Sequence, residues 1–388
     1  MKIRDKMTYL DNGATSYPKP SGVIEAYCDY AKNIGASPAR GTYETAEIAE
    51  KSIEHTRENI AKLFGAKNPG RIAFTKSATE SLNLALFGLL KPGDKVITTR
   101  MEHNAVTRPL IELERRGDIE ILSAQVTPRG RLDIEHLYEL AEKPRVRMIV
   151  TTGIANSTGV INPFWEIGEF CRKKEIIYAI DGAQLCGVYP VNVEEDFVDI
   201  LVFTGHKGLY GVPGTGGLYI SEHLGNRIKP LLYGGTGAQS DRTTMPSVLP
   251  DRYEAGTPNT PGIIALGTGV QWVLDKGVDE IHRHKQKLLQ LMMELLQDAP
   301  GIRLFGPQTD LDRTAIVPLV IEDMNPKEAA EQLWVKYKIA TRAGCHCAPQ
   351  VHFDLGAPQG TLRFSFGAFN TVEDAEYAAE AIIEIAKK

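Results

Sequence analysis

A lysine and an aspartate each follow a short apolar run in the middle of the sequence. Asp181 directly follows residues 176–180, and Lys207 comes shortly after residues 199–203. A carboxylate at the end of an apolar strand is costly to bury unless it has a cationic or hydrogen-bonding partner. A lysine at the same sheet edge is partly desolvated, which lowers its pKa and makes it a candidate nucleophile. Taken alone, Asp181 could be a helix cap and Lys207 could be a surface charge. Their placement at the same sheet edge favours a reactive site instead.

A third feature at the same edge suits an anion. Ser77, Ala78 and Thr79 follow the apolar run 71–75, where a helical pattern begins. A helix N-terminus offers free backbone N–H groups and the positive end of its dipole, although an ordinary N-cap by Ser77 or Thr79 explains these residues equally well. Together, an anion site, an acid for a protonated ring nitrogen and an imine-forming lysine are the parts that pyridoxal 5′-phosphate needs.

The elements that position these groups form an α/β pattern. Apolar runs alternate with helical stretches at residues 80–90, 106–116 and 164–174. This alternation predicts a mostly parallel sheet covered on both faces, with ligands at the carboxyl ends of its strands. The seven runs are residues 71–75, 95–99, 119–124, 147–152, 176–180, 199–203 and 217–220.

The pattern changes after Gly256. A long amphipathic helix near residues 278–297 precedes strand and helix patterns that alternate irregularly to the C-terminus. We expect a large α/β domain over residues 15–275 with a mixed, mostly parallel seven-stranded sheet. Residues 276–388, together with 1–14, would form a smaller α+β domain. The Gly/Pro-rich stretch 234–261 is predicted to be a long functional loop.

Composition excludes several classes of protein. The net charge of −5 does not indicate binding to nucleic acid or to an anionic membrane surface, both of which favour basic proteins. No apolar run reaches the roughly 18–20 residues that span a bilayer, and the polar N-terminus does not resemble a signal peptide. Five cysteines are too few for a disulfide framework. We therefore expect a cytoplasmic protein in which a free thiol is available for chemistry.

Seven short strings carry a family resemblance. They lie at residues 9–15, 181–184, 204–207, 254–258, 342–348, 361–365 and 369–371. With these strings the chain resembles the class V aminotransferases, and within them the cysteine desulfurase and selenocysteine lyase branch. The resemblance implies the fold-type-I architecture of pyridoxal-phosphate-dependent transferases, and it covers essentially the whole chain because the strings keep the family's order.

The resemblance implies a role for each residue around the cofactor. Lys207 would bond pyridoxal 5′-phosphate and later move the Cα proton, and Asp181 would keep the ring nitrogen protonated. Gln184 would contact the phenolic oxygen, while His103 would stack over the ring and act as acid or base. The phosphate is expected to contact Ser77, Ala78, Thr79, Thr204, His206 and, from the partner subunit of a homodimer, Thr257.

The resemblance also implies a substrate site and a nucleophile. Arg363 would bind the substrate carboxylate through its two-pronged guanidinium, assisted by Arg342 and by Asn156, which also belongs to the cofactor site. Cys347 would take the sulfur of L-cysteine as a persulfide, leave L-alanine, and pass the sulfur to an acceptor protein. Neighbouring Arg342 and His346 are expected to favour the thiolate. The short stretch from residue 343 to 361 resembles the group with a compact cysteine loop, so we expect slow turnover with small reductants and faster turnover with an acceptor.

Three residues depart from the family pattern. Cys345 is a second thiol beside Cys347, Ala39 stands where many relatives have a histidine, and Gly208 lengthens the turn after Lys207. These departures leave the substrate open between L-cysteine, L-selenocysteine and another thiol.

Other interpretations of the cysteines compete with the desulfurase. A metal site formed by Cys345, His346, Cys347 and His352 lacks the usual zinc spacing, and no metal is expected. With Cys347 as a plain loop residue, the chain would be a transaminase or epimerase of the same fold. A non-enzymatic scaffold would have no physical need for Lys207. The remaining thiols, Cys28, Cys171 and Cys186, are predicted to be buried small hydrophobic residues.

Overall fold

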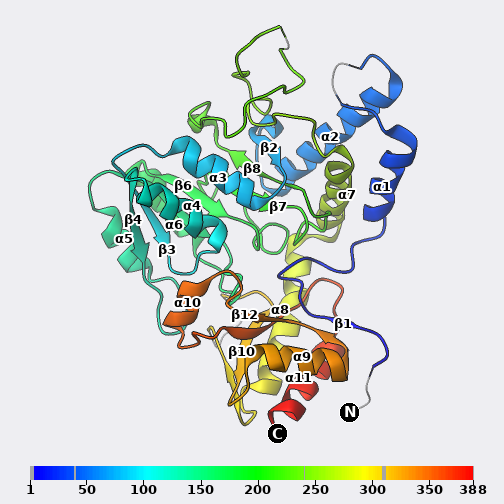
Figure 1. Ribbon diagram of the computed structural model, residues 1–388, viewed down its shortest axis with the longest axis vertical. Coiled ribbons are helices and arrows are strands. Elements are labelled where there is room, and N and C mark those ends of the chain that lie inside the picture. The colour runs from blue at the N-terminus through cyan, green and yellow to red at the C-terminus, as the bar shows by residue number, and fades with distance from the viewer. Residues whose placement is uncertain (1–3, 39–40, 240, 308–311, 388) are drawn as a thin grey trace.

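The chain folds into an upper part built around one large sheet and a lower part built around a smaller one (Figure 1). The computed structural model describes residues 4–38, 41–239, 241–307 and 312–387. Ala39, one of the departures from the family pattern, lies outside the described residues. Both ends of the chain lie at the bottom of the lower part (Figure 1).

The large sheet has seven strands in the order β2-β8-β7-β6-β5-β3-β4. β8 is antiparallel to both of its neighbours, while β7, β6, β5, β3 and β4 run parallel. The predicted mixed, mostly parallel sheet is therefore confirmed, and each strand bound falls within one residue of its expected place. The strands are β2 (Ile72–Thr75), β3 (Asp94–Thr99), β4 (Ile119–Ala124), β5 (Val146–Thr152), β6 (Ile177–Asp181), β7 (Ile200–Thr204) and β8 (Gly216–Ile220).

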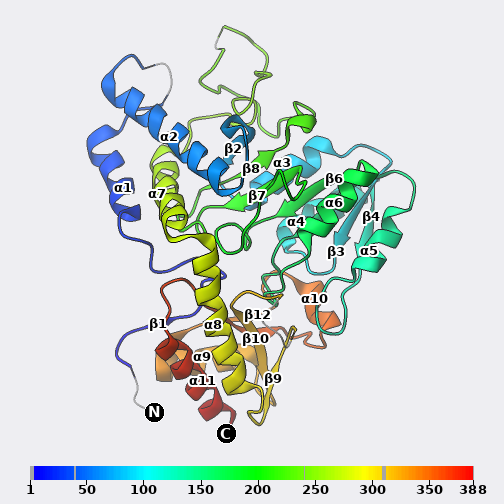
Figure 2. The same ribbon diagram turned by 180° about the vertical axis from the view of Figure 1, so that it is seen from behind.

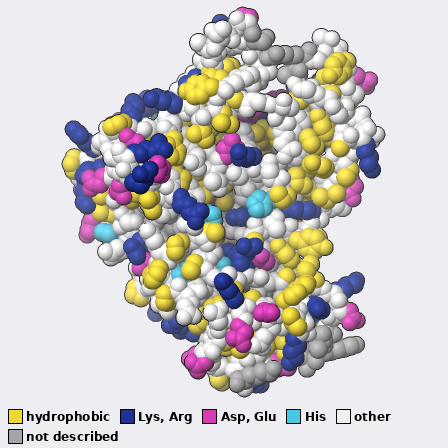
Figure 3. Space-filling model, in the orientation of Figure 1, with side chains coloured by type: hydrophobic (Ala, Val, Ile, Leu, Met, Phe, Trp, Pro, Cys, Tyr) yellow, Lys and Arg dark blue, Asp and Glu magenta, His cyan; other side chains and the backbone are white. Residues whose placement is uncertain are grey.

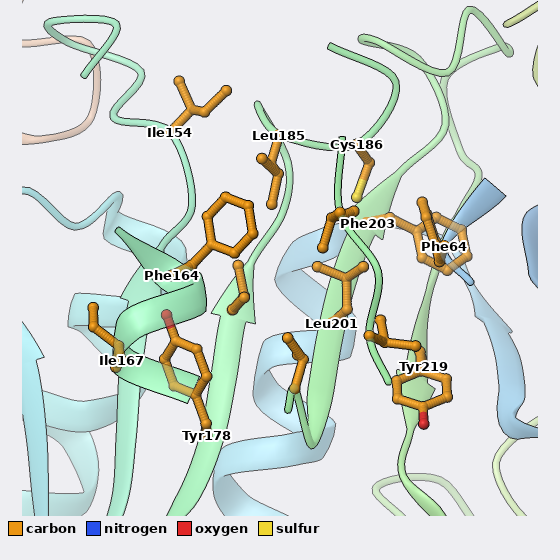
Figure 4. Close-up of a cluster of buried hydrophobic side chains, with 14 of the residues drawn as sticks. Phe64, Ile154, Phe164, Ile167, Tyr178, Leu185, Cys186, Leu201, Phe203 and Tyr219 are labelled. Carbon is orange, nitrogen blue, oxygen red and sulfur yellow. The ribbon is translucent and has the colours of Figure 1, made fainter. Parts of the chain in front are cut away.

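Both faces of this sheet are buried, because successive side chains along a strand point to opposite faces. On β7, Ile200 and Val202 belong to one core cluster, whereas Leu201 and Phe203 belong to the other. Figure 4 shows part of the second cluster, where Phe203 packs near Phe64 at a ring separation of 5.6 Å. The first cluster includes residues of α3 (Ala78–Leu89) and α4 (Asn104–Arg115), and the second includes residues of α2 (Glu44–Leu63), α5 (Ile134–Ala141), α6 (Phe164–Lys174) and α7 (Thr260–Lys276).

The lower part contains an antiparallel sheet in the order β12-β13-β10-β9. The N-terminal strand β1 (Thr8–Tyr9) pairs with β11 (Ile339–Ala340) beside it. The other elements here are α8 (Val278–Leu296), β9 (Ile302–Leu304), β10 (Ile316–Ile321), α9 (Pro326–Tyr337), β12 (Arg342–Gly344), α10 (Pro349–Asp354), β13 (Thr361–Ser365) and α11 (Val372–Ala386).

A helix pair connects the two parts. In Figure 2, α8 continues below α7 and runs down into the lower part. Gly277 separates the two helices with φ of 83°, a left-handed conformation that glycine adopts without strain. We therefore propose that the boundary between the domains 15–275 and 276–388 lies at this turn, with residues 1–14 completing the smaller domain.

Some local predictions need correction or addition. Cys171 and Cys186 are buried as expected, but Cys28 on α1 (Val23–Asp29) is half-buried, so its assignment as a buried core residue is wrong. The short helix α10 inside the cysteine loop was not predicted. Described residues 225–259 contain no helix or strand, as expected for the long loop. The described chain also has a π-helical turn (Tyr30–Ile34) and 3₁₀ turns at Pro69–Arg71 and Glu222–Leu224.

One buried charge on α8 has a testable cost. Lys285 is 8% exposed, and none of the described residues accepts a hydrogen bond from its ammonium group. It lines a cavity of about 20 Å³ together with Gln184 and Lys207, which is room for a water molecule. Burial lowers the pKa of Lys285 to about 8. At pH 7 the folded chain therefore holds a poorly solvated positive charge.

We predict that Lys285→Met raises the free energy of unfolding by about 1–3 kcal/mol at pH 7. The gain should shrink between pH 8 and 10, because the folded lysine loses its proton there before the unfolded one does. Thermal melting at pH 7 and pH 10 measures both effects, with the exposed Lys287→Met on the same helix as control. A gain that does not change with pH would contradict the prediction.

Candidate active site

The carboxyl ends of β5, β6 and β7 bring the predicted aspartate and lysine to one edge of the sheet. Asp181 is the last residue of β6, in register with Thr152 on β5 and Val202 on β7. Its side chain is 2% exposed, and its Oδ1 accepts a hydrogen bond from Ala183 N at 3.0 Å. Lys207 lies in the turn after β7, where its carbonyl accepts from Tyr210 N at 2.9 Å.

Burial makes Lys207 a better nucleophile than an ordinary lysine. Desolvation lowers the pKa of Lys207 to about 8, although the nearby Asp181 carboxylate acts in the opposite direction. The Arg363 guanidinium adds to the lowering, whereas Cys347 opposes it. An uncharged amine is therefore accessible near neutral pH, as a nucleophilic lysine requires.

Gly208, the departure next to this lysine, has a packing reason. A Cβ at Gly208 would collide with the carbonyl oxygen of Cys186, and a Cβ at Gly187 would collide with the carbonyl of Gly208. The turn after Lys207 thus lies directly against the turn that follows Asp181. This close approach of two backbones is possible because both positions are glycine.

His103 lies at the start of α4, within electrostatic range of Asp181 and Lys207. Its Nδ1 accepts a hydrogen bond from Ala105 N at 3.0 Å, so Nδ1 carries no proton. Burial lowers the pKa of His103, and the ring is neutral at pH 7 with its hydrogen on Nε2. A neutral imidazole with a free N–H fits the stacking and proton-transfer roles expected for this residue.

Glu102 is a buried acid for which the sequence analysis predicts no role. Its side chain is 3% exposed, and Oε1 accepts from Thr99 Oγ1 at 2.7 Å and from Thr152 N at 2.9 Å. Its Oε2 has no hydrogen-bond partner in the described structure. Burial raises the pKa of Glu102 to about 8, so the carboxyl group is mostly protonated at pH 7. No signal in the sequence distinguishes Glu102 from an exposed loop acid.

Three of the expected phosphate contacts form the N-terminus of α3. Ser77 is the N-cap, with its side chain accepting from Glu80 N at 3.2 Å, and Ala78 and Thr79 begin the helix. Thr204 is buried at the end of β7. The first N–H groups of a helix have no partner within it and are free for an anion.

His206, in the turn after β7, has an unused side-chain nitrogen. Its Nδ1 is buried and has no hydrogen-bond partner in the described part of the chain. Its carbonyl accepts from Ser16 N and from Lys19 Nζ, each at 3.0 Å, which ties the N-terminal segment to the turn. Burial lowers the pKa of His206 to about 4, so the ring is neutral at pH 7.

Thr257 is not brought to Lys207 by its own chain. It is exposed and lines a separate cavity of about 530 Å³ with Arg57 and Glu254. Arg57 and Glu254 form a partly buried ion pair at 2.7 Å beside this cavity. Thr257 is thus available to a second subunit, but its expected role there stays a prediction.

Asp11 connects the two arginines of the expected substrate site. Arg342 and Arg363 are paired residues on neighbouring strands β12 and β13. The Asp11 carboxylate accepts from Arg342 Nε at 3.1 Å and from Arg363 Nη2 at 3.1 Å. Gly13 lies so close that a Cβ would be 3.3 Å from the Arg363 guanidinium carbon. Arg363 Nε is buried without a hydrogen-bond partner in the described structure.

Asn156 and Gln184 each use the side-chain amide nitrogen to bond the protein itself, and Asn156 also uses its backbone carbonyl. Asn156 Nδ2 donates to the His346 carbonyl at 2.6 Å, and the Asn156 carbonyl accepts from Arg363 Nη1 at 2.9 Å. Gln184 Nε2 donates to the Gly13 carbonyl at 2.7 Å. Their expected contacts with cofactor and substrate stay predictions.

The cysteine loop, residues 345–360 between β12 and β13, is anchored to the large sheet. The Cys347 carbonyl accepts from Asn104 N at 2.7 Å, so the N-terminus of α4 holds the loop beside His103. The Arg100 guanidinium forms a two-pronged ion pair with Asp354 on α10, at 2.6 and 2.8 Å. Cys347 itself is exposed.

One expectation about this loop is wrong. His346 is buried, with its Nε2 at 3.0 Å from Thr361 Oγ1. Burial lowers its pKa to about 2, so His346 is neutral and supplies no positive charge to the Cys347 thiol.

Arg342 and Arg363 still supply positive charge at the site. Figure 3 shows Lys and Arg side chains, with His side chains beside them, near the middle of one face, where the upper and lower parts meet. Within the described ranges, no group of three or more His, Cys, Asp or Glu side chains is placed to hold a metal ion. None of the described helices is long and apolar enough to cross a membrane.

We predict that the difference in unfolding free energy between Glu102→Gln and the wild type shifts in favour of the variant by about 2–4 kcal/mol as the pH rises from 5 to 8. The unfolded glutamate ionises in this range while the folded one keeps its proton, so the wild type loses stability that glutamine cannot lose. Urea unfolding at pH 5 and 8 measures the difference, with the exposed Glu58→Gln as control. Equal differences at the two pH values would show that the buried carboxyl is ionised in the folded chain.

Comparison with known proteins agrees with this arrangement. The family model for class-V aminotransferases matches residues 8–377. A probable cysteine desulfurase of Pyrococcus abyssi is 33% identical over 99% of this chain and 96% of its own length. A cysteine desulfurase of Haloferax volcanii is 31% identical over 97% of this chain and 88% of its own length. The apo structure of a cysteine desulfurase from Thermococcus onnurineus matches with a TM-score of 0.93 and 30% identity, covering 100% of this chain and 99% of that one. This chain therefore belongs to the class-V aminotransferase family and, within it, to the cysteine desulfurase branch.

Proposed function

We propose that this chain is a pyridoxal 5′-phosphate-dependent cysteine desulfurase that converts L-cysteine to L-alanine and takes the sulfur onto Cys347. The observation that carries the proposal is the convergence of three groups. Lys207, Arg363 and Cys347 lie within electrostatic range of one another, although they come from different sheets and a loop. A transaminase needs a lysine and a carboxylate-binding arginine, but it has no use for the thiol.

The residues present fit the cofactor. A phosphate would accept hydrogen bonds from the free backbone N–H groups of Ala78 and Thr79. It would also accept one from His206 Nδ1, which has no partner in the described structure. The Asp181 carboxylate would hold the ring nitrogen, and the Lys207 amine would bond the cofactor. When bound, pyridoxal 5′-phosphate supplies an electron sink that withdraws charge from the substrate Cα.

The chain's own groups would bind and orient the substrate. Arg363 offers its unpartnered Nε to the substrate carboxylate, while Asp11 and the Asn156 carbonyl hold the guanidinium in place. The Lys207 amine would take the proton from the substrate Cα. Neutral His103 would donate from Nε2, because Nδ1 is occupied by the start of α4.

Cys347 would then act as the nucleophile. Its thiolate attacks the substrate sulfur, a new S–S bond forms, and the C–S bond of the substrate breaks with its electrons passing to carbon. The products are L-alanine and a persulfide on Cys347, from which an acceptor protein would take the terminal sulfur. Arg342, half-exposed beside the loop, supplies positive charge near this step.

Two wider assignments accompany the proposal. We place Thr257 at the active site of a partner subunit in a homodimer, because it is exposed and lines a cavity separate from that of its own Lys207. We place the enzyme in a reducing cytoplasm, because Cys28, Cys171, Cys186, Cys345 and Cys347 are all free thiols.

The first test compares substitutions of the two central residues in the purified holoenzyme. With L-cysteine and dithiothreitol, Lys207→Ala should form neither alanine nor sulfide. Cys347→Ala should lose at least roughly 100-fold in kcat for L-cysteine, but keep part of its activity on L-selenocysteine, where selenium leaves more readily. Cys28→Ala serves as the control. Full cysteine activity in Cys347→Ala would refute the persulfide mechanism.

A second test concerns the anchored loop. Hydrogen bonds from Asn104 N and Asn156 Nδ2 restrict the reach of Cys347. We predict slow turnover with dithiothreitol alone and at least roughly tenfold faster turnover when a protein acceptor thiol removes the sulfur. Steady-state alanine formation with and without candidate acceptors measures the ratio. Equal rates under both conditions would contradict the prediction.

A further inference from the structure

The second thiol of the cysteine loop is oriented by the residue between the two cysteines. Cys345 is partly exposed and Cys347 is exposed, whereas His346 between them is buried. The His346 ring is held inside by Thr361, and its carbonyl is held by Asn156 Nδ2 at 2.6 Å. The central side chain of the C-x-C sequence therefore turns inward, while both thiols stay accessible.

A tight turn brings the two cysteines together. The Ala348 N–H donates to the Cys345 carbonyl at 2.8 Å, which closes a four-residue turn. Its central residues, His346 and Cys347, have φ of 48° and 58°, the left-handed values of a type I′ turn. Two Cα atoms separated by one residue lie at most about 7 Å apart. Folding into a turn shortens this span to the range of roughly 4.4–6.8 Å that a disulfide bridges.

The contacts of Cys345 suit a thiol that acts second. Its Sγ lies 3.9 Å from the Pro358 carbonyl, to which the S–H group donates. At rest this contact points the Cys345 sulfur at the Pro358 carbonyl. A bond at that length is weak, so it leaves the Cys345 side chain free to rotate.

We propose that Cys345 resolves the persulfide on Cys347, so that this enzyme releases inorganic hydrosulfide when no acceptor removes the sulfur. The inference rests on the proposed function, because the persulfide must first form. The Cys345 thiol loses its proton to solvent, and its sulfur attacks Sγ of Cys347. The S–S bond within the persulfide breaks, and the terminal sulfur leaves with the bonding electrons as hydrosulfide.

The electron balance of this step needs no external oxidant. The terminal sulfur is reduced to hydrosulfide, and the two cysteine sulfurs are oxidised to a Cys345–Cys347 disulfide. A dithiol reductant must then restore both thiols before the next turnover. Attack within one turn competes well with attack by a free thiol, because the reacting atoms are already held close.

A single-turnover experiment separates this route from a stable persulfide. The holoenzyme is mixed with L-cysteine without reductant, and alanine, hydrosulfide and the intact mass of the chain are measured. The wild type should release about one hydrosulfide for each alanine, and its loop peptide should lose the mass of two hydrogens. Cys345→Ser should still form alanine, but its loop peptide should gain one sulfur atom on Cys347. Its hydrosulfide yield should fall at least roughly tenfold.

The control and the contrary outcomes are distinct. Cys28→Ser should behave as the wild type, since this half-buried thiol lies on α1. A wild-type chain that forms alanine and keeps the added sulfur on Cys347 would overturn this inference and leave the desulfurase proposal intact. Absence of alanine from the wild type would overturn both.

Discussion

A partly buried lysine beside a buried aspartate at the carboxyl edge of the large sheet is the constraint on which the site depends. Desolvation favours the neutral amine of Lys207 and Asp181 opposes it, which leaves a pKa of about 8. The same burial makes neighbouring titratable groups neutral: His103 and His206 lose their protons, and Glu102 keeps its own. Charge near the lysine is therefore concentrated in the groups that must recognise charged parts of the reactants.

The N-terminal segment links this edge to the small sheet. Asp11 forms an isolated bridge with Ser365 on β13 and pairs with both Arg342 and Arg363. A few residues later, Ser16 bonds the carbonyl of His206 in the turn that carries Lys207. One short stretch of chain therefore fixes Arg363, the proposed substrate-binding arginine, relative to Lys207. This is a stringent requirement, because a misplacement of about 1 Å in an active site can cost two orders of magnitude in rate.

The sequence predicted the large sheet well because its strands are apolar throughout and buried on both faces. Asp181 and Lys207 were identified because polar residues stand out at the ends of such strands. The links between distant segments could not be predicted, since hydrogen bonds such as Asn104 N to the Cys347 carbonyl use backbone groups that every residue has. The neutrality of His346 was likewise hidden, because it depends on burial against Thr361 from the next strand.

Anchoring the cysteine loop has opposite effects on the two fates of its sulfur. A tether held by Asn156 and the start of α4 limits how far Cys347 can move towards a partner, so an acceptor must approach the loop closely. The same tether keeps Cys345 within the turn, where distance does not limit its attack. In the proposed route Cys345 therefore competes with the acceptor for the persulfide on Cys347: rapid docking delivers the persulfide sulfur, and slow docking releases hydrosulfide. His346 is fixed inward whichever route the sulfur takes. The geometry of the turn therefore sets the rate at which Cys345 attacks, and the acceptor concentration decides whether sulfur is transferred or released as hydrosulfide.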